Sequence, residues 1–180
     1  MPSSTVPKAT LRSVLRRFRR NRGGSAAVEF ALVAPVFFAL LFAIIETALV
    51  FFAGQVLETI TQDSARQILT GQAQTAAFTQ ADFKTLVCSK IPALFTCGNV
   101  YVDVQSYPAF TNVNIASQID GSNNFIPAMQ YVPGGPGDIV VVRLFYQWPL
   151  FVTGLGYNIA NLAGSKRLLT ATAAFRNEPY

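Results

Sequence analysis

The chain has 180 residues, a net charge of +5 and no histidine. Histidine is the commonest general base and the commonest ligand of catalytic zinc. The sequence also shows no phosphate-binding loop, no pair of carboxylates in an acid/base setting and no nucleophile beside a base, so we expect a protein that is not an enzyme and has no catalytic, metal or cofactor site.

The positive charge is confined to the beginning of the chain. The first 24 residues hold seven of the 14 lysines and arginines and none of the nine acidic residues, so the remainder is mildly acidic. A basic segment beside a long apolar one orients a membrane helix, with the basic side in the cytoplasm. The charge therefore predicts a cytoplasmic leader over residues 1–24 and no nucleic-acid partner.

A long apolar segment follows the leader. From Phe30 to Ala53 the chain contains a single charge, Glu46. A helix over these residues reaches roughly 36 Å at about 1.5 Å per residue, and a hydrocarbon core is about 30 Å thick. We expect residues 25–53 to form a transmembrane helix and residues 54–180 to form an extracytoplasmic domain. The apolar spacing predicts that the same helix continues to about Thr70.

The junction between leader and apolar segment carries a candidate processing signal. Gly24 precedes Ser25, and Glu29 and Phe30 open the apolar run. A glycine, a glutamate five residues later and an unbroken apolar helix behind a basic leader resemble the signal that prepilin peptidases cut in type IV pilins. The resemblance implies cleavage between Gly24 and Ser25, with Glu29 and Phe30 serving processing and assembly.

The physical reasoning for this signal rests on the charge of Glu29. A carboxylate is costly in lipid and needs a partner, which the amino group freed by cleavage can supply. In pilin-like assemblies the glutamate is thought to meet the amine of a neighbouring subunit. The alternative is that Glu29 lies at the interface of an uncleaved anchor and stabilises the start of the helix.

A longer pattern resembles TadE-type pseudopilins, the minor pilins of the tight-adherence (Tad or Flp) pilus system. It comprises the basic leader, the glycine and glutamate, a proline in the span, a glutamate late in the span and an Ala-Arg pair further on. The matching residues are Ala26, Ala27, Val28, Glu29, Phe30, Pro35, Glu46, Ala65 and Arg66. The final segment, Arg176 to Tyr180, also resembles the end of many such proteins.

The resemblance implies a single-pass protein of the bacterial inner membrane, with a cytoplasmic N-terminus and a periplasmic head. It implies processing by a prepilin peptidase and a role in pilus assembly, adhesion or secretion. The implied partners are the peptidase, the other minor pilins, the major pilin, the inner-membrane assembly platform and membrane lipid. Retention in the membrane and incorporation in a surface pilus both stay open. The alternative function is an uncleaved anchor that presents a periplasmic binding domain.

Glu46 is the second acidic residue of the predicted transmembrane helix over residues 25–53, after Glu29. Carboxylates within a membrane are usually partnered or functional. However, Glu46 falls in the outer third of the span, from which it can reach the outer headgroups or be tolerated. Recognition of an intramembrane partner and simple tolerance therefore both stay open.

The two cysteines, Cys88 and Cys97, both follow the predicted span. In an oxidising compartment, two cysteines at this spacing indicate one structural disulfide. Closing so short a loop contributes roughly 2.5–3 kcal/mol on the chain-entropy estimate. The spacing does not fit a C-x-x-C redox pair, and two cysteines without histidine make a poor metal site.

The rest of the chain predicts one more helix and a small sheet. A capped start at Thr79 opens a short helix that ends near Cys88. Alternation over residues 100–105 predicts a half-buried strand, and residues 139–148 and 168–175 predict two further strands. The fold class is therefore α+β and pilin-like, with one long N-terminal helix packed on a small antiparallel sheet.

Two connections are predicted between these strands. Residues 108–137 are rich in Asn, Gly and Pro, which indicates a long surface connection. Residues 149–156 form an apolar loop, which either packs onto the sheet or contacts a neighbouring subunit or the membrane.

Overall fold

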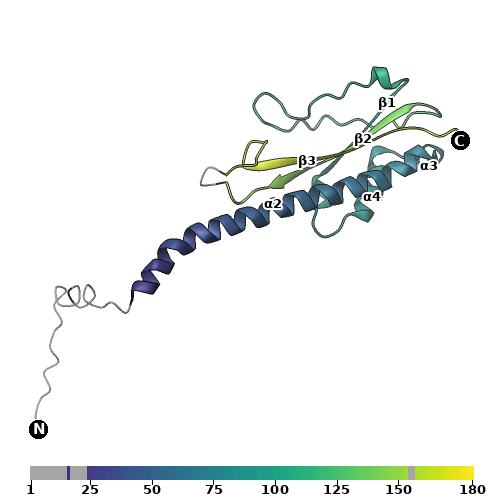
Figure 1. The fold of residues 1–180 in the computed structure, drawn as a ribbon. Helices are drawn as coiled ribbons and strands as arrows, with labels where there is room; N and C mark the ends of the chain where they lie inside the picture. The colour runs from purple at the N-terminus through teal and green to yellow at the C-terminus, as the bar shows by residue number, and fades with distance from the viewer. Residues whose placement is uncertain (1–15, 17–23, 154–156) are drawn as a thin grey trace, which may run out of the picture. The chain divides into compact units, whose positions relative to one another are not determined.

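The computed structural model describes residue 16 and residues 24–153 and 157–180 (Figure 1). The predicted leader therefore lies outside the described residues except for Arg16 and Gly24. The chain divides into two compact units, Met1–Phe42 and Ala43–Tyr180, which we describe separately.

Helix α2, Ser25–Leu69, is the longest element and contains Pro35. Within the described residues, it is the one helix that is long and apolar enough to cross a membrane, by length and composition. Its continuation to Leu69 matches the helix expected from the sequence. Gly71 follows with a φ of 73°, a left-handed conformation that glycine adopts without steric cost, so the helix stops there.

Two short helices follow. They are α3, Gln72–Thr75, and α4, Gln80–Lys90. Thr79 caps α4 and forms a capping box with Asp82, as the sequence indicated, and the hydrogen bonds from Thr79 lower the pKa of Asp82. A disulfide joins Cys88 near the end of α4 to Cys97 in the 3₁₀ turn η2, Cys97–Asn99, and so fixes the chain just before the first strand.

Strands β1, Val100–Tyr107, β2, Ile139–Pro149, and β3, Lys166–Arg176, form an antiparallel sheet in that order. In the register of the sheet, Asp103 lies opposite Arg143, and Pro149 lies opposite Lys166. A second 3₁₀ turn, η3, Phe110–Asn112, follows β1. These elements confirm the predicted α+β fold with a long N-terminal helix, a small antiparallel sheet and a second short helix.

The main core of the Ala43–Tyr180 unit lies between the helices and one face of the sheet (Figure 1). Side chains alternate across a strand, so residues two apart share a face. The buried residues from α2 and α4 include Leu57, Ile68 and Phe83, and they pack against strand residues that include Val102 and Val142. This packing attaches the second part of α2 to the sheet.

The other face of the sheet is also partly covered. In β1, Val100, Val102 and Val104 are buried as the alternation predicted, and Asp103 on the other face is buried as well. Phe145 packs there among Ile119, Phe125 and Met129 of the connection between β1 and β2. The backbone of the connection also pairs with Val104 of β1. The expectation of a surface connection over residues 108–137 is confirmed, because most of these residues are exposed. The segment also supplies partly buried apolar side chains that pack on the sheet.

Candidate functional site

The predicted cleavage site lies at the start of α2. Gly24 is exposed and directly precedes Ser25, the first residue of the helix. A Cβ atom placed on Gly24 meets nothing within 4 Å. Among the described residues, the fold therefore gives no steric reason for glycine at this position.

Glu29 and Phe30 lie about one turn into α2, and both are exposed in the single chain. The apolar side chains that follow, such as Leu32 and Val33, are exposed too. Among the described residues of the Met1–Phe42 unit, the helix thus presents a largely apolar surface to its surroundings. Such a surface suits lipid or the helices of other subunits.

Glu46 lies on α2 where the helix contacts the loop after β2. Its side chain is 7% exposed, and its carboxylate accepts hydrogen bonds from the backbone N–H groups of Phe151, at 2.5 Å, and Val152, at 3.1 Å. The neighbouring Thr47 hydroxyl hydrogen-bonds the hydroxyl of Tyr157. The structure therefore places this carboxylate against a loop of its own chain, a pairing that sequence reasoning missed.

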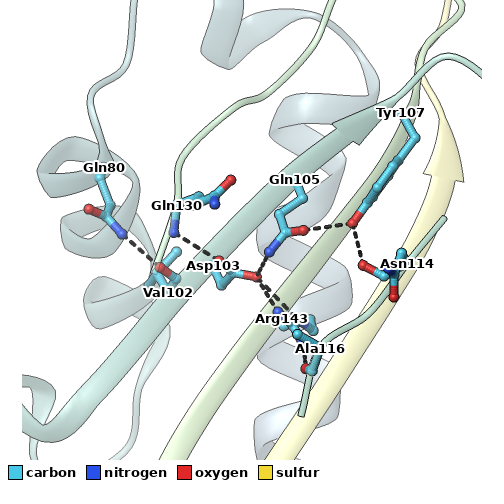
Figure 2. Close-up of polar contacts among 9 residues, drawn as sticks. All are labelled: Gln80, Val102, Asp103, Gln105, Tyr107, Asn114, Ala116, Gln130 and Arg143. Atoms are coloured by element: carbon cyan, nitrogen blue, oxygen red, sulfur yellow. Dashed lines mark hydrogen bonds and ion pairs between the residues drawn. The ribbon is translucent and has the colours of Figure 1, made fainter. Parts of the chain in front are cut away.

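A buried ion pair connects β1, β2 and the long connection (Figure 2). Asp103 Oδ2 accepts from Nη2 and Nε of Arg143 at 2.7 and 3.0 Å and from the side chain of Gln105, and Oδ1 accepts from the backbone of Gln130 at 2.8 Å. Arg143 also donates to the carbonyl of Ala116 at 3.0 Å. Both carboxylate oxygens accept hydrogen bonds, so the pair holds the connection on the sheet.

The C-terminal segment that resembles the end of TadE-type proteins closes over the end of α2. The backbone N–H of Glu178 donates to the carbonyl of Leu69 at 2.9 Å. Asn177 donates to the carbonyls of Pro133 and Gly135, and the ring of Tyr180 occupies the space beside Gly71. These residues therefore have a structural role in the head.

No group of three or more His, Cys, Asp or Glu residues that could hold a metal ion occurs in the part of the chain that the structure describes.

Residues 24–66 match the family model described as TadE-like protein. No curated protein and no solved structure matches the chain. The matched segment begins at Gly24 and ends at Arg66 within α2, with Ala65 buried in the core and Arg66 exposed.

TadE-like proteins are pilus components and are not known as enzymes, and the apolar N-terminal helix supports a single-pass membrane protein. The resemblance to TadE-type proteins is confirmed over residues 24–66, and this match supports an association of the protein with the Tad pilus.

Proposed function

We propose that the protein is a minor pilin-like subunit of the Tad pilus, cut after Gly24 by a prepilin peptidase, and that it assists pilus assembly without catalysis. The observation that carries this proposal is the start of the TadE-like match at Gly24, directly before the first residue of α2. The supporting feature is the exposed Gly24 directly in front of an apolar helix.

Cleavage at this junction changes the electrostatics of the helix start. It leaves an ammonium group on Ser25, one turn before Glu29 along α2. An ammonium group of a neighbouring copy or partner pilin then neutralises the Glu29 carboxylate, which would otherwise be costly within the membrane. The pair sets the register in which the apolar helices pack.

The remaining parts follow from this arrangement. The basic leader stays in the cytoplasm, where the peptidase works at the membrane face, and the disulfide-containing head lies in the periplasm. The partners are the peptidase, the other minor pilins and the major pilin, the inner-membrane assembly platform and membrane lipid. The exposed apolar surface of the helix packs in lipid before assembly and on other helices after it.

The processing step is tested by expressing the full chain with and without the prepilin peptidase of a Tad system. We expect the mass of the membrane-bound protein to fall by residues 1–24 only when the peptidase is present. Gly24→Val should block this loss, whereas Gly121→Val is the matched control, because a Cβ at Gly121 also meets nothing within 4 Å. Full-length protein in every case would support the uncleaved anchor instead.

The assembly step is tested with variants of Glu29 in cells that make Tad pili. Glu29→Ala should be cleaved normally but should reduce the number of pili counted by electron microscopy. Glu29→Asp keeps the negative charge and should retain more pili than Glu29→Ala. Normal piliation of the alanine variant would contradict the proposed pairing with an amino group.

A further inference from the structure

The end of the sheet at which β2 stops and β3 starts gathers apolar, aromatic and basic side chains. Phe151 follows β2 and is 85% exposed. Trp148 and Arg167 lie opposite each other in the register and are partly exposed, and Lys166, opposite Pro149, is exposed. Aromatic rings beside lysine or arginine are typical of protein surfaces at the boundary between lipid chains and headgroups.

Glu46 ties this end of the sheet to α2. Its buried carboxylate accepts from the N–H groups of Phe151 and Val152, and the hydroxyls of Thr47 and Tyr157 hydrogen-bond beside it. The loop that carries Phe151 is therefore held at the level of Glu46 along the helix. Glu46 itself belongs to the apolar segment that the sequence assigns to the membrane.

The helix at this level has two different sides. Val50 and Ala53 are buried beneath the head, whereas Ile44, Phe51 and Phe52 are exposed. At this position along its axis, the helix therefore contacts the head on one side and presents an apolar surface on the other. The lipid or protein that contacts these three exposed side chains therefore also lies next to the loop that carries Phe151.

The level of Glu46 corresponds to the outer boundary of a membrane. A helix needs about 20 residues to cross the hydrocarbon core. Counted along the sequence from Phe30, such a span closes at Leu49, about one turn past Glu46. A loop held at Glu46 therefore lies just inside the lipid headgroups.

We infer that the loop after β2 seats the head on the outer leaflet of the membrane that α2 crosses. Phe151 inserts among the lipid chains, and Lys166 and Arg167 lie at the lipid phosphates. Glu46 is a positioning residue, because its two hydrogen bonds hold the loop at this depth. The inference rests on the membrane span of the proposed function and does not depend on cleavage at Gly24 or on pilus assembly.

The test uses the single tryptophan of the chain, Trp148. In a Trp148→Phe background, Phe151→Trp places the fluorophore in the loop, and Phe110→Trp places it in η3 as the control. Phe110 is also exposed, but it follows the end of β1 that pairs with Ile139, at the other end of β2. The 11 residues of β2 separate the two ends of the sheet by about 33 Å.

Both full-length variants are reconstituted in vesicles of phosphatidylethanolamine and phosphatidylglycerol, with and without bromine on the upper acyl-chain carbons. We expect the tryptophan at position 151 to lose most of its emission in the brominated vesicles and the tryptophan at position 110 to keep it. The unmodified protein provides a second measurement that needs no variant, because Trp148 should lose part of its emission in the same lipids.

Three outcomes overturn the inference. The first is unquenched emission from position 151 and from Trp148 in protein that floats with the vesicles, which leaves the membrane span of the proposed function intact. The second is equal quenching of the tryptophans at positions 151 and 110, which indicates contact with lipid that is not specific to the loop after β2. The third is protein that does not float with the vesicles, which removes the membrane span as well.

Discussion

Replacing Arg143 by methionine should destabilise the head strongly, because it leaves a buried carboxylate without its counterion. The side chains of Arg143 and Asp103 are 4% and 0% exposed, and the variant loses two hydrogen bonds between them and a third to Ala116. Breaking a buried pair from one side typically costs about 3–5 kcal/mol. Methionine keeps the volume of the side chain, so the loss comes mainly from the charge and the hydrogen bonds.

The free energy of unfolding is measured by urea titration of the full chain in detergent, followed by the fluorescence of Trp148. This residue packs against the core beside Phe95 and is the single tryptophan of the sequence. The matched control is Arg176→Met, because Arg176 is exposed and donates to the carbonyl of Gly137. The control should change the free energy of unfolding by less than about 1 kcal/mol. An Arg143→Met variant as stable as the control would contradict the stabilising role of the Arg143–Asp103 pair.

Three further predictions concern the head. Gly71→Ala should lower the free energy of unfolding by at least about 1–2 kcal/mol, because it puts a side chain at positive φ and into the ring of Tyr180. If the double variant Gly71→Ala with Tyr180→Ala recovers stability in the same titration, the overlap with the ring is part of this cost. Replacing both Cys88 and Cys97 by serine should cost roughly 2.5–3 kcal/mol, and reducing agent should lower the urea midpoint of the wild type but not that of this variant. Burial raises the pKa of Tyr131 to about 12, so its contribution to stability is complete below about pH 10 and is lost between pH 10 and 12. Urea titrations across that pH range should show a smaller loss of unfolding free energy for Tyr131→Phe than for the wild type. An equal loss in the two proteins would contradict this.

The helices and strands could be predicted from the sequence because each has a local sequence signature. The length and apolar content of α2, the glycine at position 71 and the Thr79 cap act within a few residues of the structure that they determine. The alternating residues of β1 and the continuous apolar run of β2 likewise mark strands directly. The start of the TadE-like segment at Gly24 was accessible for the same reason, because the motif is contiguous.

The packing on the second face of the sheet could not be predicted from the sequence, because it depends on contacts between residues distant in the chain. Ile119, Phe125 and Met129 are spaced irregularly in a segment rich in turn residues, so neither a helical nor a strand period reveals them. One signal was present: Asp103 and Arg143 each interrupt an apolar strand with a charge. Two such interruptions of opposite sign indicate a buried pair when the strands are neighbours.

The partner of Glu46 was hidden for a different reason. Its carboxylate is bound by backbone N–H groups, which every residue except proline carries and which leave no mark in the side-chain sequence. The sequence indicated only that a carboxylate in an apolar helix needs a partner. The structure shows that the loop after β2 supplies hydrogen bonds to it within the same chain.

The most direct test of the proposed processing is to identify the first residue of the protein purified from cells that assemble Tad pili. Intact-mass and N-terminal peptide measurements on the membrane fraction and on sheared pili identify it without any variant. We predict a chain that begins at Ser25 in the membrane fraction and in any copies that the sheared pili contain. Protein that still carries residues 1–24 in these cells would contradict this prediction.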